Sequence, residues 1–408
     1  MKGQIFKRGD TWSYRLDLGV DPATGKRLRP SKGGYVSEDA AAIAMAEARI
    51  ALASGTYPDT KTILFKDFAE AWLSEYKLSV SRGSAYIRHG HIHNHLNNYF
   101  GCVGISKISK VMYQNMLNSL SKAMSPKTLK EYTRVTISSI NSTANMIFKK
   151  AVFLGCIKEN PVANTAIPRK QKKVVHKENN ESSLPKYMEK HDLKTFLDTA
   201  EKYGLEDDYL IFSLLAYSGM RGGELCALEW PMLSLEDNTV KIRQTCYNEQ
   251  NNVTKYVLNP PKTESSIRDI LLDKDLCEEL KAHKKKHAAY KLSCQEYHCV
   301  QDVSGTLEKR DFVFVRKGRL AGYPLYLRFI ESRMQRLLNI ANIDTHYTPH
   351  SLRHTHTSLL AEAGVGLTEI MERLGHQNDG ITKKVYLHVT RTMKNDAAEK
   401  FSALMKSL

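Results

Sequence analysis

The sequence contains no long apolar run. No segment approaches the roughly 20 consecutive apolar residues that a membrane-spanning helix needs, and the first ten residues, MKGQIFKRGD, lack the apolar stretch of a secretory signal peptide. We therefore expect neither a membrane protein nor a secreted protein, but one that works in the cytoplasm.

Cysteine is sparse and scattered. The chain has seven cysteines, an odd number, and no two of them form a CxxC pair. Disulfide frameworks use an even number of cysteines, so we expect reduced thiols. No self-similar period of roughly 20–50 residues occurs either, which excludes a solenoid.

The chain has enough material for several folded domains. Its 408 residues are 42% hydrophobic and 25% charged, which is ordinary for two or three globular domains. The net charge is +16, and residues 62–180 alone carry 18 basic and 6 acidic side chains, a net of +12. Such a segment attracts a partner of dense negative charge, most simply nucleic acid. A soluble basic protein without such a partner is the alternative.

The first 60 residues predict a small sheet followed by a helix. Extended runs at 3–7, 11–19 and 26–36 are separated by turn residues, and Ser37 precedes an Ala-rich run that is typical of an N-capped helix. The basic side chains of this unit suit a sheet that contacts DNA, with a solvated surface as the alternative. They are Lys7, Arg8, Arg15, Lys26, Arg27 and Arg29.

The rest of the chain divides into three further parts. Residues 61–168 show helical spacing of apolar residues, residues 169–184 are a basic polar linker, and residues 185–408 mix helices with a hairpin-like stretch at 239–272. The expected fold class is multidomain, mainly α with small β elements. Basic residues predicted to contact DNA in the middle of the chain are Arg88, Lys127, Lys130, Lys170 and Lys172.

Polar residues interrupt the apolar pattern of the last part at several places. In Gly219-Met220-Arg221-Gly222-Gly223-Glu224, an apolar helix stops and Arg221 opens the next one, with Glu224 one turn on. Flanking Leu and Ala residues favour burial, where a guanidinium needs an anion. An exposed pair, worth ~0.2–0.5 kcal/mol, is the alternative.

A second helix start carries a histidine and an arginine. Thr348 is a good N-cap and Pro349 suits the first helical position, so His350 and Arg353 project from the first turns on one face. Helix N-termini bind phosphate, although a histidine at a helix start more often has a structural role.

Two further places complete the set. Leu374-Gly375-His376 ends a helix and is followed ten residues later by Tyr386, whereas Lys262 lies in a hairpin turn, where a lysine is usually just solvated. Two arginines, two histidines, a lysine and a tyrosine, with no carboxylate cluster for Mg²⁺, suit attack on a phosphodiester without a metal. Guanidinium and imidazole donors stabilise the added negative charge, and a tyrosine needs a base to activate it.

This set, in this order, resembles the tyrosine recombinase family, the phage-integrase type of site-specific recombinases. The motifs are Gly-Met-Arg221-Gly-Gly-Glu224-Leu, Pro-Lys262-Thr, His350-Ser-Leu-Arg353-His, Leu-Gly-His376 and Tyr386-Leu-His. Residues 61–168 resemble the family's core-site-binding domain. The first 60 residues resemble the arm-binding domain of integrases from mobile elements of low-GC Gram-positive bacteria and their phages.

The resemblance implies a role for each motif. Tyr386 would attack the phosphodiester and form a 3′-phosphotyrosyl link, while Arg221 and Arg353 hold the phosphate oxygens and His376 adds a further donor. His350 would assist deprotonation of the tyrosine.

The remaining two positions support this chemistry. Lys262 would protonate the leaving 5′ oxygen, and Glu224 would support the first arginine. Neither a metal nor another cofactor is expected. The double glycine Gly222-Gly223 departs from the family pattern, and it predicts a looser helix start at up to ~1 kcal/mol per glycine.

The resemblance also implies partners. These are double-stranded DNA with core and arm sites, a homo-tetramer on paired sites that exchanges strands through a Holliday junction, an excisionase and a host DNA-bending protein. A tail helix at 395–407 would pack on an adjacent protomer. Integration and excision of a mobile element or prophage is the expected function, in a bacterial cytoplasm at the nucleoid. A chromosome-dimer resolvase and a relative that binds DNA without cutting it are the alternatives.

Two histidine-rich stretches invite a metal interpretation. The set His283, His287, Cys294, His298 and Cys299 imitates a zinc site, but it lies in a Lys-rich aperiodic segment without a CxxC pair. An insertion with chance ligands is favoured. The alternating histidines of residues 89–95 favour phosphate contact or a polar face over a ligand site, because i,i+2 residues on a helix point apart.

Overall fold

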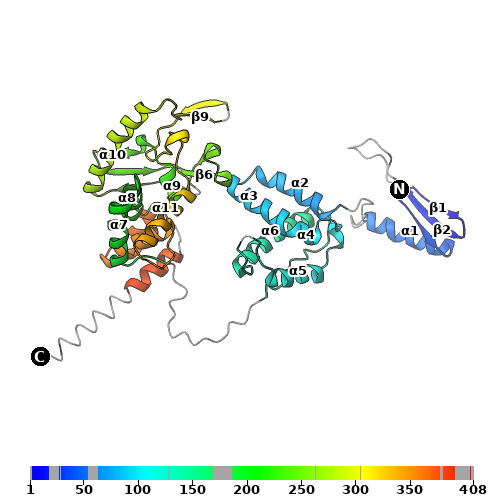
Figure 1. The fold of residues 1–408 in the computed structure, drawn as a ribbon. Helices are drawn as coiled ribbons and strands as arrows, with labels where there is room; N and C mark the ends of the chain where they lie inside the picture. The colour runs from blue at the N-terminus through cyan, green and yellow to red at the C-terminus, as the bar shows by residue number, and fades with distance from the viewer. Residues whose placement is uncertain are drawn as a thin grey trace. The chain divides into compact units, whose positions relative to one another are not determined.

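The structure is a computed structural model. It describes residues 2–17, 27, 29–53, 63–126, 128–168, 186–261, 263–303, 305–376, 380–390 and 405. The chain divides into two compact units, Met1–Val175 and His176–Leu408, whose elements are labelled in Figure 1. No helix among the described residues combines the length and apolar character needed to cross a bilayer.

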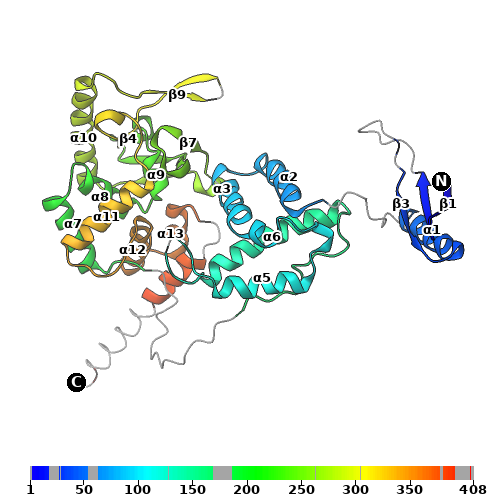
Figure 2. The same cartoon turned by 45° about the vertical axis from the view of Figure 1, so that its right-hand side comes forward.

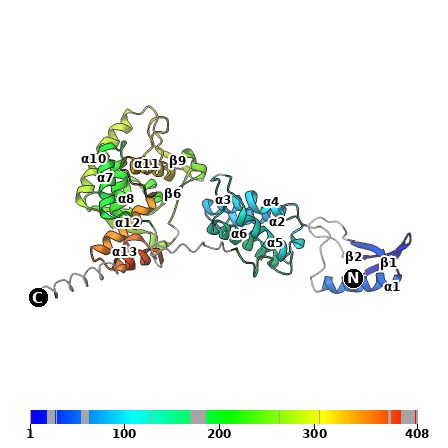
Figure 3. The same ribbon diagram turned by 60° about the horizontal axis from the view of Figure 1, so that its bottom comes forward.

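The N-terminal part of the first unit is a three-stranded antiparallel sheet with one helix (Figure 3). The strands are β1 (Lys2–Arg8), β2 (Thr11–Asp17) and β3 (Ser31–Tyr35), and the helix is α1 (Glu38–Ala53). Tyr14 and Leu16 alternate inward on β2 and pack against Ala48 of the helix. The Oγ of Ser37 accepts from the backbone N of Ala40 at 3.1 Å, so Ser37 caps the helix. The predicted sheet and helix are confirmed.

The second part of this unit is helical. Its elements are α2 (Phe65–Lys77), α3 (Arg82–His91), the π-helical turn η1 (Ile92–Leu96), α4 (Asn97–Phe100), the 3-10 turn η2 (Ile105–Lys107), α5 (Lys110–Lys122) and α6 (Arg134–Phe153). Phe65, Trp72 and Ile92 are buried against Ile147 and Phe148 of α6, so these amphipathic helices share one apolar core. Ser81, Ser109 and Thr133 cap α3, α5 and α6.

The second unit packs helices around small sheets (Figure 2). Its helices are α7 (Lys190–Tyr203), α8 (Asp208–Ser218), α9 (Gly222–Cys226), α10 (Lys274–Ser293), α11 (Leu327–Ile340), α12 (Pro349–Glu362) and α13 (Leu367–Leu374), and residues 380–390 are also helical. Single 3-10 turns are η4 (Trp230–Met232), η5 (Glu249–Asn251), η6 (Val253–Lys255), η7 (Glu264–Ser266) and η8 (Gly318–Leu320).

The strands of this unit form three antiparallel groups. They are β4 (Leu233–Ser234), β5 (Thr239–Ile242) and β8 (Arg268–Leu271) in one sheet, β6 (Thr245–Asn248) with β7 (Tyr256–Asn259), and β9 (Val300–Val303) with β10 (Thr306–Lys309). The hairpin-like stretch predicted at 239–272 is therefore two nested strand pairs. Lys262 falls between β7 and β8 in the sequence and lies outside the described part of the chain.

Helix α8 lies at the centre of this unit. Its residues 210–216 are all buried, and it packs against α7, α10 and α12. Because one end of α8 leads directly into the Arg221 loop and its neighbour α12 carries Arg353, the apolar core fixes the relative positions of the two arginines.

Candidate active site

The first arginine stands where α8 turns into α9. Gly219 ends α8 in the left-handed conformation at φ +64°, and a Cβ there would lie 2.6 Å from Cδ2 of His356. Only glycine fits this turn. Arg221 follows at the N-cap of α9, with its side chain 36% exposed.

Glu224 holds Arg221 from one turn further along α9. Its Oε1 accepts from Nη1 of Arg221 at 2.8 Å, and its Oε2 accepts from the backbone N of Arg221 at 2.9 Å. The carboxylate is 4% exposed. The sequence left open whether this pair is buried or superficial. The structure shows a buried carboxylate with a half-exposed guanidinium, which leaves that guanidinium within reach of a ligand.

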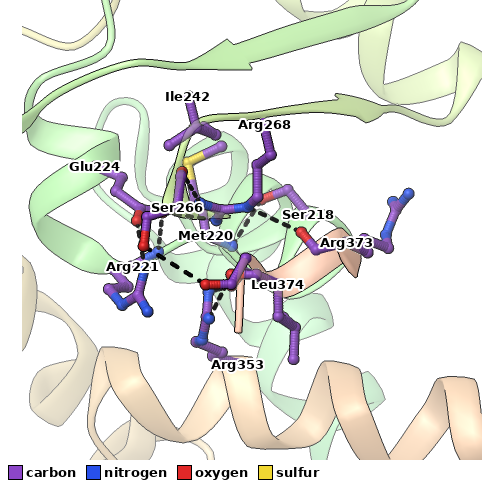
Figure 4. Close-up of polar contacts among 12 residues, drawn as sticks. Ser218, Met220, Arg221, Glu224, Ile242, Ser266, Arg268, Arg353, Arg373 and Leu374 are labelled. Atoms are coloured by element: carbon purple, nitrogen blue, oxygen red, sulfur yellow. Dashed lines mark hydrogen bonds and ion pairs between the residues drawn. The ribbon is translucent and has the colours of Figure 1, made fainter. Parts of the chain in front are cut away.

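A second arginine, Arg268, contacts the same carboxylate (Figure 4). It stands at the start of β8, and its Nη2 donates to Oε2 of Glu224 at 2.8 Å. Burial works to raise the pKa of Glu224, but hydrogen bonds from Arg268 and the charges of both arginines outweigh it, so the carboxyl pKa lies below its ordinary value. Glu224 is therefore ionised in the folded protein.

Arg353 is enclosed by the protein. It is 1% exposed, and its Nη1 donates to the carbonyl of Gly219 at 2.8 Å while its Nη2 donates to the carbonyl of Leu374 at 2.6 Å. Helix α12 begins as predicted, with Thr348 at the N-cap and Pro349 at its first position. His350 is exposed on the first turn of α12. Arg353 thus ties the Arg221 loop to the end of α13.

His376 follows the glycine that ends α13. Gly375 has φ +70°, and a Cβ there would lie 2.7 Å from the carbonyl oxygen of Ser265 in the turn before β8. Nη2 of Arg353 lies 2.5 Å from Nε2 of His376, whose Nδ1 lies 2.9 Å from Oγ1 of Thr382. Two predicted site residues, Arg353 and His376, are thus in direct contact.

Tyr386 lies on the helical segment 380–390. Its half-buried ring packs against a small apolar cluster that is formed by Ala361, Ile370, Leu374 and Val389. The same residue Leu374 gives its carbonyl to Arg353, so the tyrosine-bearing segment packs on the helix end that binds the buried arginine.

Sequence reasoning missed a second buried cluster beside this one. Arg373 donates through Nε to Nε2 of His356 at 3.1 Å and through Nη2 to the carbonyl of Leu271 at 2.9 Å. The Nδ1 of His356 lies 2.9 Å from the carbonyl of Ala216. Burial, with the charge of Arg373, lowers the pKa of His356 to about 4, so this imidazole is neutral.

The two glycines after Arg221 lie against neighbouring elements. A Cβ at Gly222 would lie 2.6 Å from Cδ1 of Leu327, and one at Gly223 would lie 2.6 Å from Oγ1 of Thr245. The sequence predicts a loosened helix start at this pair. The structure shows instead that both glycines permit close approach of α11 and β6.

Five of the basic residues predicted on the N-terminal sheet are exposed, and the sixth, Lys26, lies outside the described residues. Lys7 and Arg8 end β1, and Arg15 lies on β2 with its guanidinium 5.1 Å from the ring centroid of Phe6. Arg27 and Arg29 both contact Asp17, at 3.1 Å and 3.4 Å. These positions suit contacts with a polyanion.

Arg88 has partners within its own domain. Its Nη1 donates to Oγ1 of Thr143 at 2.9 Å and to the carbonyl of Ser139 at 3.4 Å, so it links α3 to α6. Lys130 is exposed. Other predicted DNA-contacting or catalytic lysines lie outside the described residues: Lys127, Lys170, Lys172 and Lys262.

The histidines that imitate a zinc site belong to a hydrogen-bonded core. The indole Nε1 of Trp230 donates to Nδ1 of His287 at 2.9 Å, so Nε2 of this neutral ring donates to the hydroxyl of Tyr297 at 2.7 Å. His283 lies 2.8 Å from the carbonyl of Val313. Across the described residues, no group of three His, Cys, Asp or Glu side chains is placed to hold a metal ion.

Comparisons with known proteins bear directly on this arrangement. The profile of the Phage integrase family matches residues 186–393, slightly more than half of the chain, and that of the phage integrase N-terminal SAM-like domain matches residues 64–121.

The chain belongs to the phage integrase family.

Named relatives span nearly the whole chain. A tyrosine recombinase XerC-like protein of Caldanaerobacter subterraneus subsp. tengcongensis is 25% identical over 417 residues, or 99% of each chain. The ICEBs1 integrase of Bacillus subtilis is 23% identical over 412 residues, 98% of this chain and 99% of its own.

A solved relative shares the fold. The Tn1549 transposon integrase, in complex with transposon right end DNA, superposes with a TM-score of 0.62 at 18% identity, covering 82% of this chain and 100% of that one. The predicted fold class is confirmed. The family profile over residues 186–393 and the tyrosine recombinase among the relatives identify the protein as a tyrosine-type site-specific recombinase, an enzyme that breaks and rejoins DNA strands.

Proposed function

We propose that this recombinase integrates and excises a mobile genetic element and that Tyr386 is its nucleophile. One observation carries the assignment of the site. Arg353 donates hydrogen bonds both to the carbonyl of Gly219, which lies close to Arg221 in the sequence, and to the carbonyl of Leu374 at the end of α13, which precedes His376. Tyr386 packs against the apolar cluster that contains the side chain of Leu374. This contact between Arg353 and segments distant in the sequence supports the proposal that Arg221, Arg353 and His376 act together.

The charge of the cluster supports phosphodiester chemistry. Arg221 and Arg268 share the ionised carboxylate of Glu224, and Arg353 lies beside them with carbonyl partners, which leaves an excess of positive charge (Figure 4). A phosphodiester gains negative charge on its non-bridging oxygens as a nucleophile attacks. Fixed guanidinium donors stabilise that charge more than they stabilise the ground state.

The proposed reaction exchanges one phosphoester for another. The phenolic oxygen of Tyr386 bonds to phosphorus as its proton passes to His350, and the bond from phosphorus to the 5′ oxygen breaks. Lys262 gives the leaving oxygen a proton. Attack by a 5′ hydroxyl of the partner strand reverses these steps and releases the tyrosine, so rejoining needs no ATP.

The assembly follows from the stoichiometry of cutting. Each chain carries one Tyr386, and exchange between two duplexes cuts four strands, so four protomers act on a pair of sites through a Holliday junction.

We propose residues 1–60 as the arm-site domain, residues 61–168 as the core-site domain, residues 169–184 as a linker and residues 185–408 as the catalytic domain. Excisionase and a host DNA-bending protein set direction, in the bacterial cytoplasm.

A nicked DNA substrate tests the nucleophile. A nick beside the scissile position lets the 5′ fragment diffuse away, which traps the covalent intermediate. The unaltered protein is expected to give a protein–DNA adduct that Tyr386→Phe abolishes, whereas the control Tyr203→Phe, at a tyrosine 50% exposed at the end of α7, retains it. Equal trapping by Tyr386→Phe would overturn the assignment.

A chromosome-dimer resolvase is the second candidate, because a XerC-like relative spans the whole chain. Recombination assays separate the two functions. A mobile-element integrase recombines two unlike sites, one of which carries arm sequences, and loses efficiency when the arms are deleted. A resolvase recombines two identical short sites and is indifferent to arms.

A further inference from the structure

Arg268 is the buried arginine that the motif pattern did not single out. Its side chain is 5% exposed, and all three of its nitrogens donate to protein acceptors. Nε donates to the carbonyl of Arg373 at 2.9 Å, and Nη1 donates to the carbonyl of Ser266 at 3.0 Å. Nη2 donates to Glu224. All three nitrogens of Arg268 are thus engaged by acceptors within the protein.

The two arginines share Glu224 unequally. Arg268 faces both carboxylate oxygens with its two terminal nitrogens, at 2.8 Å and 3.4 Å. Arg221 uses only Nη1 of its side chain, together with its backbone N–H. The remaining guanidinium N–H groups of Arg221 are therefore not committed to this carboxylate.

This division has an electrostatic consequence. A buried carboxylate with one arginine forms a neutral pair, and a fork-to-fork geometry would turn both terminal nitrogens of Arg221 toward Glu224. A second arginine on the carboxylate makes the group of three +1 overall and occupies the bidentate position. The positive field at the phosphate site is thereby retained.

We propose that Arg268 is a positioning residue: it holds Glu224 bidentately so that the guanidinium of Arg221 stays turned toward the scissile phosphate. The inference deepens the proposed function and rests on it. Arg268 acts through Glu224 and Arg221 and through its bond to the Arg373 carbonyl, which lies next to the Leu374 carbonyl that Arg353 binds. One side chain thus supports both predicted phosphate-binding arginines.

Arg268→Met tests this with the nicked substrate. The substitution leaves Glu224 with Arg221 alone, so the rate of covalent adduct formation is expected to fall about 100-fold, the order seen when one donor to a transition-state anion is lost. The affinity of the variant for the DNA site should stay within about twofold of that of the unaltered protein, because the other contacts between protein and DNA are unchanged. Arg336→Met, at an exposed arginine of α11 that donates to the Tyr203 carbonyl, is the matched control and should behave as the unaltered protein.

The double variant Arg268→Met/Glu224→Gln separates positioning from simple structural support. Removing the carboxylate's charge frees Arg221 from a neutral pair, so the double variant should form adduct about tenfold faster than Arg268→Met alone. Support of the fold alone predicts the opposite, because the double variant loses more hydrogen bonds. Arg268→Lys, which keeps the charge but has one nitrogen, should fall between Arg268→Met and the unaltered protein.

The outcomes remain distinguishable. If the unaltered protein forms no adduct, the proposed function fails. If it forms adduct and Arg268→Met matches it, the positioning role fails. Failure of the double variant to exceed Arg268→Met also overturns the role. Thermal unfolding of every variant is followed in parallel. If Arg268→Met does not fold, the adduct-formation rates of Arg268→Lys and of the double variant, each compared with the unaltered protein, decide whether Arg268 has the positioning role.

Discussion

Nη2 of Arg353 lies 2.5 Å from Nε2 of His376, and arginine can only donate, so Nε2 is the acceptor. The proton of the neutral ring is then on Nδ1, which donates to Oγ1 of Thr382 at 2.9 Å. Thr382 is 2% exposed and therefore fixes the orientation of the imidazole against Arg353. With both ring nitrogens engaged in this way, His376 has no N–H left for the phosphate in this arrangement, so the donor role that the resemblance implies would require Arg353 or Thr382 to release the ring.

Thr382→Val is expected to slow adduct formation about tenfold, because loss of an outer hydrogen bond leaves the imidazole free to rotate. Binding of the DNA site should not change. Thr390→Val is the matched control, since the Thr390 hydroxyl donates to the backbone carbonyl of Tyr386 at 2.9 Å and does not orient His376. Equal rates for the two variants would contradict the role of Thr382.

Gly223→Ala is expected to destabilise the protein by about 1–3 kcal/mol, the range for overpacking a filled interior. The new Cβ would lie 2.6 Å from Oγ1 of Thr245 and 3.3 Å from the carbonyl of Cys246. Urea unfolding measures the change.

A pair of controls makes this result specific. Gly380→Ala, at an exposed helical position with nothing within 4 Å of the added Cβ, should be neutral or slightly stabilising. Thr245→Ala combined with Gly223→Ala should cost less than the sum of the single changes, because it removes the obstructing hydroxyl. If the losses in the free energy of unfolding were additive, the clash of the new Cβ with the Thr245 hydroxyl would not be the cause of the destabilisation.

The protein is expected to lose stability as the pH falls from about 6.5 toward 4. The pKa of His356 lies at about 4 in the folded state against an ordinary 6.5, so the unfolded chain binds the additional proton in this range. The contribution of His356 is complete above pH 6.5 and disappears as the pH approaches 4. It amounts to roughly 3 kcal/mol.

His356→Gln removes this titration while keeping a donor for Ala216 and an acceptor for Arg373. Its stability should therefore depend less steeply on pH across the same range, as measured by urea unfolding at several pH values. His191→Gln, at a side chain 91% exposed, should leave the slope unchanged. An unchanged slope in His356→Gln would show that folding does not lower the pKa of His356.

DNA binding is expected to weaken steeply with salt. Residues 62–180 carry a net charge of +12, and neutralising about six phosphates would lower the affinity by about 1,000-fold between about 50 and 200 mM salt. Fluorescence anisotropy of a labelled core site measures the slope. A flat dependence would mean that this segment is not the main DNA clamp.

Turn and capping residues in the sequence predict where the helices of the site begin and end, because helix ends are determined by neighbouring residues. Gly219, Thr348 with Pro349, and Gly375 mark helix ends through turn and capping preferences, and each lies where expected. These boundaries decide where Arg221, Arg353 and His376 stand.

Contacts between distant residues carry no such signal. Arg268 and Glu224 are 44 residues apart, and an arginine in a polar hairpin is usually solvated. A weak signal does exist, because Arg268 and Ile270 are buried and alternate with the exposed Asp269 and Leu271 along β8. An arginine at a strand's inward positions needs a buried acceptor.

The histidines of α10 are a case in which a sequence pattern suggests a metal site and the structure shows core residues. Their i,i+4 spacing places His283 and His287 on one inward face, where metal ligands and core residues look alike in sequence. The partners that decide the matter, Trp230 and Tyr297, come from separate segments and become neighbours only in the folded chain.

The three consecutive carbonyls at the end of α13 connect the two buried arginines of the candidate site mechanically. Those of Arg373, Leu374 and Gly375 accept from Arg268, Arg353 and Ser266 respectively. A displacement of this helix end would therefore disturb the hydrogen bonds of Arg268 and Arg353 together. Both arginines are anchored to neighbouring carbonyls of one short helix, so the position of either cannot be altered there without altering the other.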